Sequence, residues 1–250
     1  MNSLSFEGFT ALRSIFADLA ADRAAEAVIL TGSGRAFCAG LALDSLVGVE
    51  SGGVQPEVLR HQFDAALNPL LRQMMDLPKP LVVAVNGTVA GGGIGLALAG
   101  DVVLAARNAA FHCAFVPMLG IVPDAGASWL LPNLMGRNKA LPMALLGESL
   151  TAEEAERAGL IYRAVAPEEL EQQALACAGR LMRASAEALH MTRHLFTDAL
   201  SSDYSSLLDR ERDANVALCT RPELAEGVRA FLSKREPDFR ALRARETNNA

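Results

Sequence analysis

Two glycine-containing turns constrain what this chain can fold into more than any other feature of its sequence. They are Phe37-Cys38-Ala39-Gly40-Leu41 and Ala90-Gly91-Gly92-Gly93-Ile94-Gly95. Each turn follows an apolar run of β type, and the second leads into an apolar stretch of helical character. Such an arrangement can direct two backbone N–H groups at one oxygen atom, and one good donor stabilises a developing oxyanion by about 3 kcal/mol. The two turns therefore predict an oxyanion-binding pair of N–H groups.

The order of the apolar segments predicts an α/β fold. Buried strands are expected over residues 27–31, 81–85 and 101–105, with amphipathic helices over residues 5–21 and 57–75. Strands that alternate with helices favour βαβ units and a mainly parallel sheet. The strands lack polar alternation, which is typical of a sheet whose two faces are both covered.

Beyond about Pro123 the pattern is helical almost throughout. Two segments, Thr151-Ala152-Glu153-Glu154 and Thr220-Arg221-Pro222-Glu223, have the capping-box pattern of a helix start. A short apolar run over residues 160–165 interrupts the helices, and a mobile loop is expected from Ser45 to Gln55. We therefore expect an α/β core followed by a helical region.

Composition and charge argue against several classes of protein. The chain has 250 residues, of which 51% are hydrophobic, and its net charge of −6 argues against nucleic acid as the main partner. Neither a membrane-spanning window nor a signal peptide is found, so we expect a cytoplasmic protein with no membrane partner. No metal site is expected, because the carboxylate or His cluster that one needs is absent. Four cysteines lack CxxC spacing, and each is predicted to be a buried reduced thiol: Cys38, Cys113, Cys177 and Cys219.

Four separated segments resemble, in the right order, the signatures of the crotonase (enoyl-CoA hydratase/isomerase) superfamily. They are residues 32–40, 84–93, 120–126 and 231–239. This resemblance covers nearly the whole chain, and it implies a crotonase-type spiral of ββα units over residues 1–190. It also implies a C-terminal helical region over residues 191–250 that mediates trimerisation, in a homotrimer or a hexamer built as a dimer of trimers. Family members usually begin with two strands before the helix that starts here near Leu4, so either the given sequence starts late or this protein lacks the strand pair.

The resemblance also assigns roles to residues. The N–H groups of Leu41 and Gly92 are expected to bind the thioester carbonyl of an acyl-CoA, with coenzyme A present only as part of the substrate and no permanently bound cofactor. Phe231 and Lys234 resemble residues that contact coenzyme A from a neighbouring subunit, Lys234 near a phosphate. The backbone expected to meet the adenine and pantetheine is that of Arg35, Ala36, Phe37 and Ala39.

The acid and base residues depart from the family pattern. Hydratases of the family use two glutamates, whose positions here are Gly95 and either Phe115 or Val116. None of these side chains moves a proton, so hydration by two glutamates is disfavoured. Asp124 remains, at a position where dienoyl-CoA isomerases and the epoxyphenylacetyl-CoA isomerase branch resemble this chain by carrying an aspartate. Apolar burial would raise its pKa and suit it to shuttle a proton; the alternative is that it caps the helix starting near Gly126.

We therefore expect an acyl-CoA thioester isomerase with Asp124 as proton shuttle. The alternatives are an atypical enoyl-CoA hydratase that uses Asp124 with a water, and a homologue that binds acyl-CoA without turnover. Fatty-acid oxidation and aromatic degradation both use this branch, so the pathway stays open. His112 is predicted to be a buried, non-catalytic histidine. An apolar acyl pocket is expected from Leu41, Leu43, Leu46, Phe115, Trp129 and Leu130.

Overall fold

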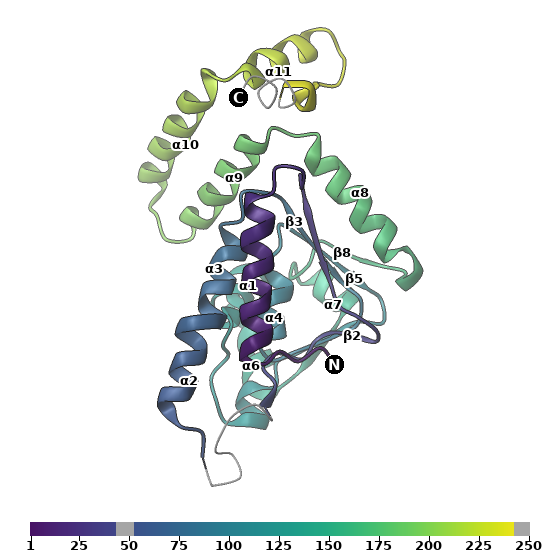
Figure 1. Cartoon of the computed structure of the whole chain (residues 1–250), viewed down its shortest axis with the longest axis vertical. Helices are drawn as coiled ribbons and strands as arrows, with labels where there is room; N and C mark the ends of the chain where they lie inside the picture. The colour runs from purple at the N-terminus through teal and green to yellow at the C-terminus, as the bar shows by residue number, and fades with distance from the viewer. Residues whose placement is uncertain (44–52, 243–250) are drawn as a thin grey trace.

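The computed structural model describes residues 1–43 and 53–242. In this part of the chain the strands form two four-stranded sheets with helices packed around them (Figure 1). The first sheet has the order β1 (Val28–Thr31), β3 (Leu81–Val85), β5 (Val102–Ala106) and β8 (Arg163–Val165), all parallel. The second has the order β2 (Ala36–Cys38), β4 (Thr88–Ala90), β6 (Ala110–His112) and β7 (Ser149–Thr151).

The first six strands alternate between the two sheets, and helical structure follows each pair. β1, β3 and β5 enter the first sheet, and β2, β4 and β6, which follow them, enter the second. This is a spiral of ββα units, so the predicted fold is confirmed. The mainly parallel pairing expected from the strand pattern is confirmed, since among the described strands only the β6–β7 pair is antiparallel. The strand pattern did not indicate the second sheet. Strands of three residues are too short to show a period of two in the sequence.

Two long helices precede the second turn of the spiral. α1 (Phe6–Ala21) confirms the helix predicted over residues 5–21. The helix predicted over residues 57–75 is also present, with a π-helical segment between two α-helical parts. These parts are α2 (Pro56–Gln62), η2 (Phe63–Leu67) and α3 (Asn68–Met75). The loop predicted from Ser45 to Gln55 lies mostly outside the described residues.

The helices beyond the second glycine turn complete the body and the C-terminal arm. They are α4 (Gly93–Leu98), α5 (Ala127–Met135), α6 (Arg137–Leu146), α7 (Ala152–Arg157), α8 (Leu170–Met182), α9 (Ala186–Ala199), α10 (Tyr204–Cys219) and α11 (Pro222–Leu232). The capping box at Thr151 is confirmed, because its hydroxyl accepts from the Glu154 N–H and Glu154 reaches back. The box predicted at Thr220 is wrong: Arg221 is the N-cap of α11, no side chain caps it, and Pro222 fills the first turn.

The first sheet is buried on both faces. All five residues of β3 are buried, as its unbroken apolar sequence predicts. On one face, α8 packs Leu170, Ala174 and Ala178 against Val82 and Leu104. The other face joins the main core, which α1, α3 and α4 close.

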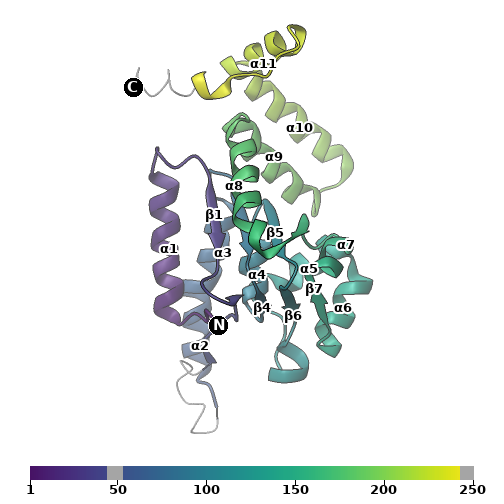
Figure 2. The same ribbon diagram turned by 90° about the vertical axis from the view of Figure 1, so that its right-hand side faces the viewer.

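α9 is fastened to this body, whereas α10 and α11 stand off from it (Figure 2). The predicted division at residue 190 falls inside α9 (Ala186–Ala199). Arg193, on this helix, forms an ion pair of 2.6 Å with Asp101, and both side chains are more than four-fifths buried. Its guanidinium also donates to the backbone carbonyls of Met75 and Leu77 at the end of α3. The residue ties three segments that are distant in the sequence.

Replacing Arg193 with alanine is therefore expected to lower the free energy of unfolding by about 3 kcal/mol, because the Asp101 carboxylate stays buried without its cation. Urea unfolding followed by circular dichroism measures this. Arg183→Ala is the matched control, since its ion pair with Glu236 spans 3.9 Å between exposed side chains, and its loss should cost less than about 0.5 kcal/mol. An equal loss of unfolding free energy in the two variants would contradict the role of Arg193 in fastening α9 to the body.

Candidate active site

The first glycine turn is held in place by an asparagine from the loop between β3 and β4. Asn86 accepts a hydrogen bond from the Gly32 N–H at 3.0 Å and donates to the Gly34 carbonyl at 2.8 Å and the Ala36 carbonyl at 3.2 Å. Gly32 has no space for a side chain, because a Cβ there would lie 2.5 Å from the Ala36 carbonyl oxygen. The backbone around Arg35, which is expected to meet coenzyme A, is thus bound to the loop between β3 and β4.

The two glycine turns touch each other through their backbones. A Cβ on Gly40 would lie 2.6 Å from the Gly92 nitrogen, and Gly40 has a φ of +83°. Both facts require glycine at this position, since a side chain would clash and the left-handed conformation would strain it. Gly93 is equally confined, with a virtual Cβ 2.3 Å from the Cys38 carbonyl oxygen. Turns separated by some fifty residues in the sequence therefore form one site.

The backbone N–H groups of Leu41 and Gly92 are not used by the hydrogen bonds of the strand-like segment and the helix to which they belong. Leu4 donates to the Gly40 carbonyl at 2.8 Å and accepts from the Ala42 N–H at 2.9 Å. In an extended segment alternate residues direct their N–H groups to opposite sides, so the Leu41 N–H points away from Leu4. Gly92 is the N-cap of α4, and N–H groups at the start of a helix lack intrahelical acceptors.

Asp124 lies in a left-handed turn that follows the π-helical segment η3 (Phe115–Leu119). Ala125 and Gly126 have φ values of +50° and +77°. The N-cap of α5 is Gly126, without a side-chain cap, and Asp124 contributes only its backbone carbonyl, which accepts from the Ala127 N–H at 2.8 Å. The alternative that the Asp124 side chain caps this helix is therefore wrong.

The Asp124 carboxylate faces the second glycine turn. A Cβ on Gly92 would lie 3.3 Å from Asp124 Oδ1, so only the space of a missing side chain separates the two groups. Burial raises the pKa of Asp124 from 3.8 to about 6. Burial also raises the pKa of Cys113 to about 11, and the charge of Asp124 adds to this shift. The structure thus places one buried carboxylate beside the two glycine turns, which touch each other.

The space of the first family glutamate is filled by backbone. A Cβ on Gly95 would lie 1.7 Å from the Ala125 carbonyl oxygen, so no side chain fits there while the Asp124 turn keeps its conformation. Phe115, at the second glutamate position, is buried with 2% exposure, and Val116 is half-buried. Neither position provides a group that moves a proton.

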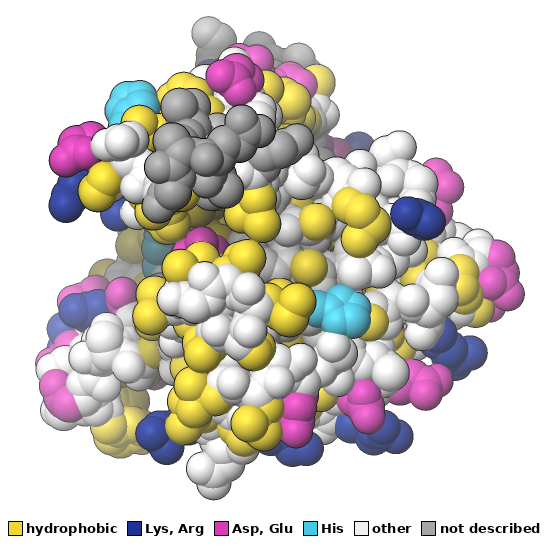
Figure 3. Space-filling view, turned by 90° about the horizontal axis from the view of Figure 1, so that it is seen from below, with side chains coloured by type: hydrophobic (Ala, Val, Ile, Leu, Met, Phe, Trp, Pro, Cys, Tyr) yellow, Lys and Arg dark blue, Asp and Glu magenta, His cyan; other side chains and the backbone are white. Residues whose placement is uncertain are grey.

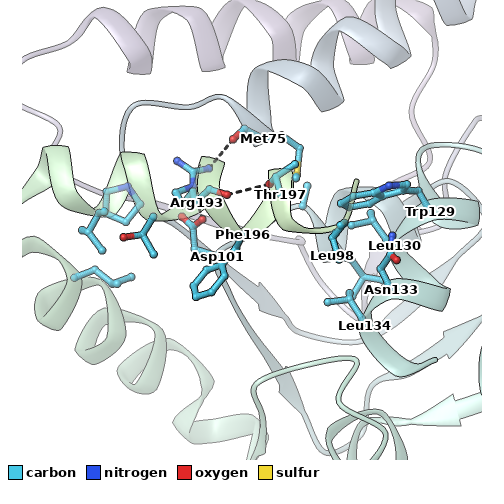
Figure 4. A pocket seen from close by; sticks show the side chains of 17 residues that line it. Met75, Leu98, Asp101, Trp129, Leu130, Asn133, Leu134, Arg193, Phe196 and Thr197 are labelled. Atoms are coloured by element: carbon cyan, nitrogen blue, oxygen red, sulfur yellow. Dashed lines mark hydrogen bonds and ion pairs between the residues drawn. The ribbon is translucent and has the colours of Figure 1, made fainter. Parts of the chain in front are cut away.

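The expected acyl-pocket residues do not all come together. Trp129 and Leu130 line a cavity of about 470 Å³ between α5 and α9, beside the Asp101–Arg193 pair, and Asp124 is not among the residues that line it (Figure 4). Helical spacing alone does not tell which neighbour a residue of α5 faces. Leu46 lies outside the described residues.

Apolar side chains gather at the end of the molecule that holds α2 (Figure 3). The segment before Asp124 has several apolar side chains that are exposed, namely Met118, Leu119, Ile121 and Val122.

Phe231 and Lys234 lie on α11 and the turn after it, away from the glycine turns of their own chain (Figures 1 and 2). Phe231 is 82% exposed and Lys234 is also exposed. These two residues are not brought together with Asp124 within one subunit.

The remaining candidate residues have structural roles. His112 is half-buried, and its Nδ1 is hydrogen-bonded to the Ser149 hydroxyl at 2.5 Å. All four cysteines are free, as expected, and Cys38 and Cys113 are buried. The prediction of burial is wrong for Cys177, which is half-buried, and for Cys219, which is exposed because α10 stands off from the body.

The described residues contain neither a membrane-spanning helix nor a metal-binding cluster. None of their helices combines the length and apolar character that crossing a membrane requires. Among the same residues, no group of three or more His, Cys, Asp or Glu side chains is arranged to hold a metal ion.

A ββα spiral whose two glycine turns meet beside a buried carboxylate defines a crotonase-fold protein. The chain belongs to the Enoyl-CoA hydratase/isomerase family, whose model matches residues 1–242. It is 38% identical to the 1,2-epoxyphenylacetyl-CoA isomerase of Escherichia coli K12 over 239 residues, covering 96% of this chain and 90% of that protein. It is 42% identical to a "Probable enoyl-CoA hydratase" of Rhodobacter capsulatus over 215 residues, covering 86% and 81%. The crystal structure of an enoyl-CoA hydratase from Polaromonas sp. JS666 matches with a TM-score of 0.87 at 32% identity, covering 94% of this chain and 90% of that one.

Proposed function

We propose that this protein is an acyl-CoA isomerase in which Asp124 shuttles a proton while the N–H groups of Leu41 and Gly92 bind the thioester oxygen. The observation that carries the proposal is the position of the Asp124 carboxylate against Gly92, with the space beside Gly95 filled by backbone. One carboxylate is sufficient for moving a double bond, since the same group can remove and return the proton.

The reaction balances with this single base. Asp124 takes a proton from the carbon α to the thioester, and the electron pair of that C–H bond forms a C–C double bond while the carbonyl π electrons move to oxygen. The two N–H groups stabilise the resulting enolate. Protonated Asp124 then gives the proton to the γ-carbon of a 3-enoyl thioester, and the electrons return to re-form the carbonyl. The double bond has moved, and Asp124 is again a carboxylate.

Hydration requires more proton-moving groups than this site provides. It requires one group to activate water and a proton donor for carbon, whereas Gly95, Phe115 and Val116 supply neither. The isomerase named among the relatives supports the proposal. The hydratase name of another relative keeps an atypical hydratase, with Asp124 acting on a water, as the second candidate.

The proposal extends to the substrate and the assembly. Coenzyme A would lie along the backbone of Arg35, Ala36, Phe37 and Ala39, with Phe231 and Lys234 contributed by a neighbouring subunit. A homotrimer, or a hexamer of two trimers, would supply that neighbour, in the cytoplasm. The exposed apolar side chains of α11 support such a contact, since Phe231 and Leu232 are 82% and 75% exposed.

The test compares two reactions of the purified protein. Double-bond migration in a 3-enoyl-CoA, or isomerisation of 1,2-epoxyphenylacetyl-CoA, is expected to exceed hydration of crotonyl-CoA by at least about a hundredfold, because only the former needs a single proton-moving group. Faster hydration would favour the atypical hydratase. Binding of acyl-CoA without either reaction, and without solvent deuterium entering at the α-carbon, would show a binding protein that lacks turnover.

A further inference from the structure

The chain leaves α11 through a turn whose left-handed residue is a lysine. The Arg235 N–H donates to the Ala230 carbonyl at 3.0 Å and the Lys234 N–H to the Phe231 carbonyl at 3.1 Å. This pair of bonds is the Schellman motif that ends many helices, and its left-handed position is usually glycine. Lys234 occupies that position with a φ of +51°. A residue with a Cβ is strained there, and such strain persists only where the surroundings enforce it.

Glu226, a residue of α11, supplies the contacts that hold this turn in its strained conformation. Glu226 is 8% exposed, and its carboxylate accepts hydrogen bonds from both guanidinium ends of Arg235, Nη1 to Oε1 at 2.6 Å and Nη2 to Oε2 at 3.1 Å. Oε1 also accepts the Asp238 N–H at 3.0 Å. A bidentate pair of this kind is both strong and directional. The buried Glu226 carboxylate thus binds the chain at Arg235 and at Asp238, which follow Lys234 by one and four residues.

The charges around the turn are unevenly paired. Arg229 lies 3.4 Å from Glu226 and Arg235 lies 2.6 Å from it, so both guanidiniums share this carboxylate. Within residues 1–43 and 53–242, no acidic side chain forms an ion pair with Lys234, and its side chain is exposed. The hydrogen bonds from Arg235 hold the pKa of Glu226 at about 2, so the carboxylate remains ionised at any working pH. The turn therefore presents one uncompensated ammonium group from a fixed backbone.

We infer that Glu226 is a positioning residue, which holds the strained turn after α11 so that Lys234 binds a phosphate group of the coenzyme A substrate. This inference rests on the proposed function, in which Lys234 reaches coenzyme A bound to a neighbouring subunit. Glu226 itself touches no substrate in this arrangement, because both its oxygens are occupied by Arg235 and the Asp238 N–H.

The first experiment separates the phosphate-bearing part of the substrate from its acyl end. Glu226→Gln should weaken coenzyme A binding in isothermal titration about tenfold and raise KM for acyl-CoA by the same factor, with kcat unchanged. KM for the same acyl group on pantetheine, which has no phosphate, should not change. Glu223→Gln is the matched control, because Glu223 is equally buried on α11 but pairs with Arg221, before the helix. An equal rise in KM for the pantetheine ester would show a merely structural role and overturn the inference.

A second variant guards against misfolding of Glu226→Gln. Lys234→Gly removes the ammonium group but suits the left-handed position, so its thermal stability should equal or exceed that of the wild type. Its coenzyme A affinity should fall about tenfold, and the double variant with Glu226→Gln should bind no more weakly. Unchanged affinity in Lys234→Gly would overturn this inference alone. If the wild type bound no coenzyme A, the proposed function would fail with it, so the two failures are distinct.

Discussion

Replacing Asp124 with asparagine is expected to lower the isomerisation rate by at least about a hundredfold, because the amide cannot accept the α-proton. Asn has nearly the shape of Asp, so the contact of residue 124 with Gly92 should persist. Steady-state turnover of a 3-enoyl-CoA or of 1,2-epoxyphenylacetyl-CoA measures the change, and Asp124→Ala should lose at least as much. Undiminished turnover of the true substrate by either variant would remove Asp124 from the mechanism.

Two pH profiles separate this catalytic role from a structural one. Burial raises the pKa of Asp124 to about 6, so kcat/KM of the wild type should fall about tenfold per pH unit below about pH 6. The folded pKa lies above the unfolded value of 3.8, so ionisation of Asp124 costs stability as the pH rises from about 4 through 6. Asp124→Asn should therefore be more stable than the wild type by about 3 kcal/mol at pH 8, and equal to it near pH 3. A variant less stable at pH 8 would indicate a structural carboxylate.

Replacing Gly95 with alanine is expected to lower isomerase activity about a hundredfold and the free energy of unfolding by about 3 kcal/mol. The new Cβ would lie 1.7 Å from the Ala125 carbonyl oxygen, so the turn that holds Asp124 must move. Thermal unfolding and turnover of the same sample measure both effects. Gly179→Ala in α8 is the matched control, since its Cβ would meet nothing within 4 Å and alanine favours the helix. Wild-type activity in Gly95→Ala would show that the Asp124 turn adapts and does not govern catalysis.

The same contact bears on the two candidate reactions of this site, isomerisation and hydration. A glutamate at position 95 and the present Asp124 turn compete for one volume, so adding the carboxylate to this backbone would displace the existing one. The absence of a glutamate at position 95 is thus coupled to the backbone conformation of the turn that carries Asp124. This coupling is a steric property of the turn from Asp124 to Gly126, with its two left-handed residues.

Local patterns in the sequence predicted the elements that are long enough to show a helical period or an unbroken apolar run. α1 follows from its apolar spacing, β1, β3 and β5 follow from apolar runs, and the capping box at Thr151 follows from its residue types. The strands of the second sheet have three residues each and show no such period, so the crotonase resemblance, rather than the pattern, implied their arrangement. The cap predicted at Thr220 failed because Arg221 occupies that place.

The sequence by itself determined the two glycine turns, the lack of the two family glutamates and the choice of Asp124, because each depends on residue identity at a recognisable motif. Only the tertiary structure decided that the turns touch, that Asp124 faces Gly92, that Ala125 backbone fills the space beside Gly95, and that Trp129 lines a cavity that Asp124 does not line. These are relations between segments that are not neighbours in sequence. They depend on how strands of two sheets bring their carboxyl ends together, which no local spacing encodes. The same holds for Glu226. The sequence shows a glutamate there, but its hydrogen bonds to Arg235 and to the Asp238 N–H form only once the chain has folded back on α11.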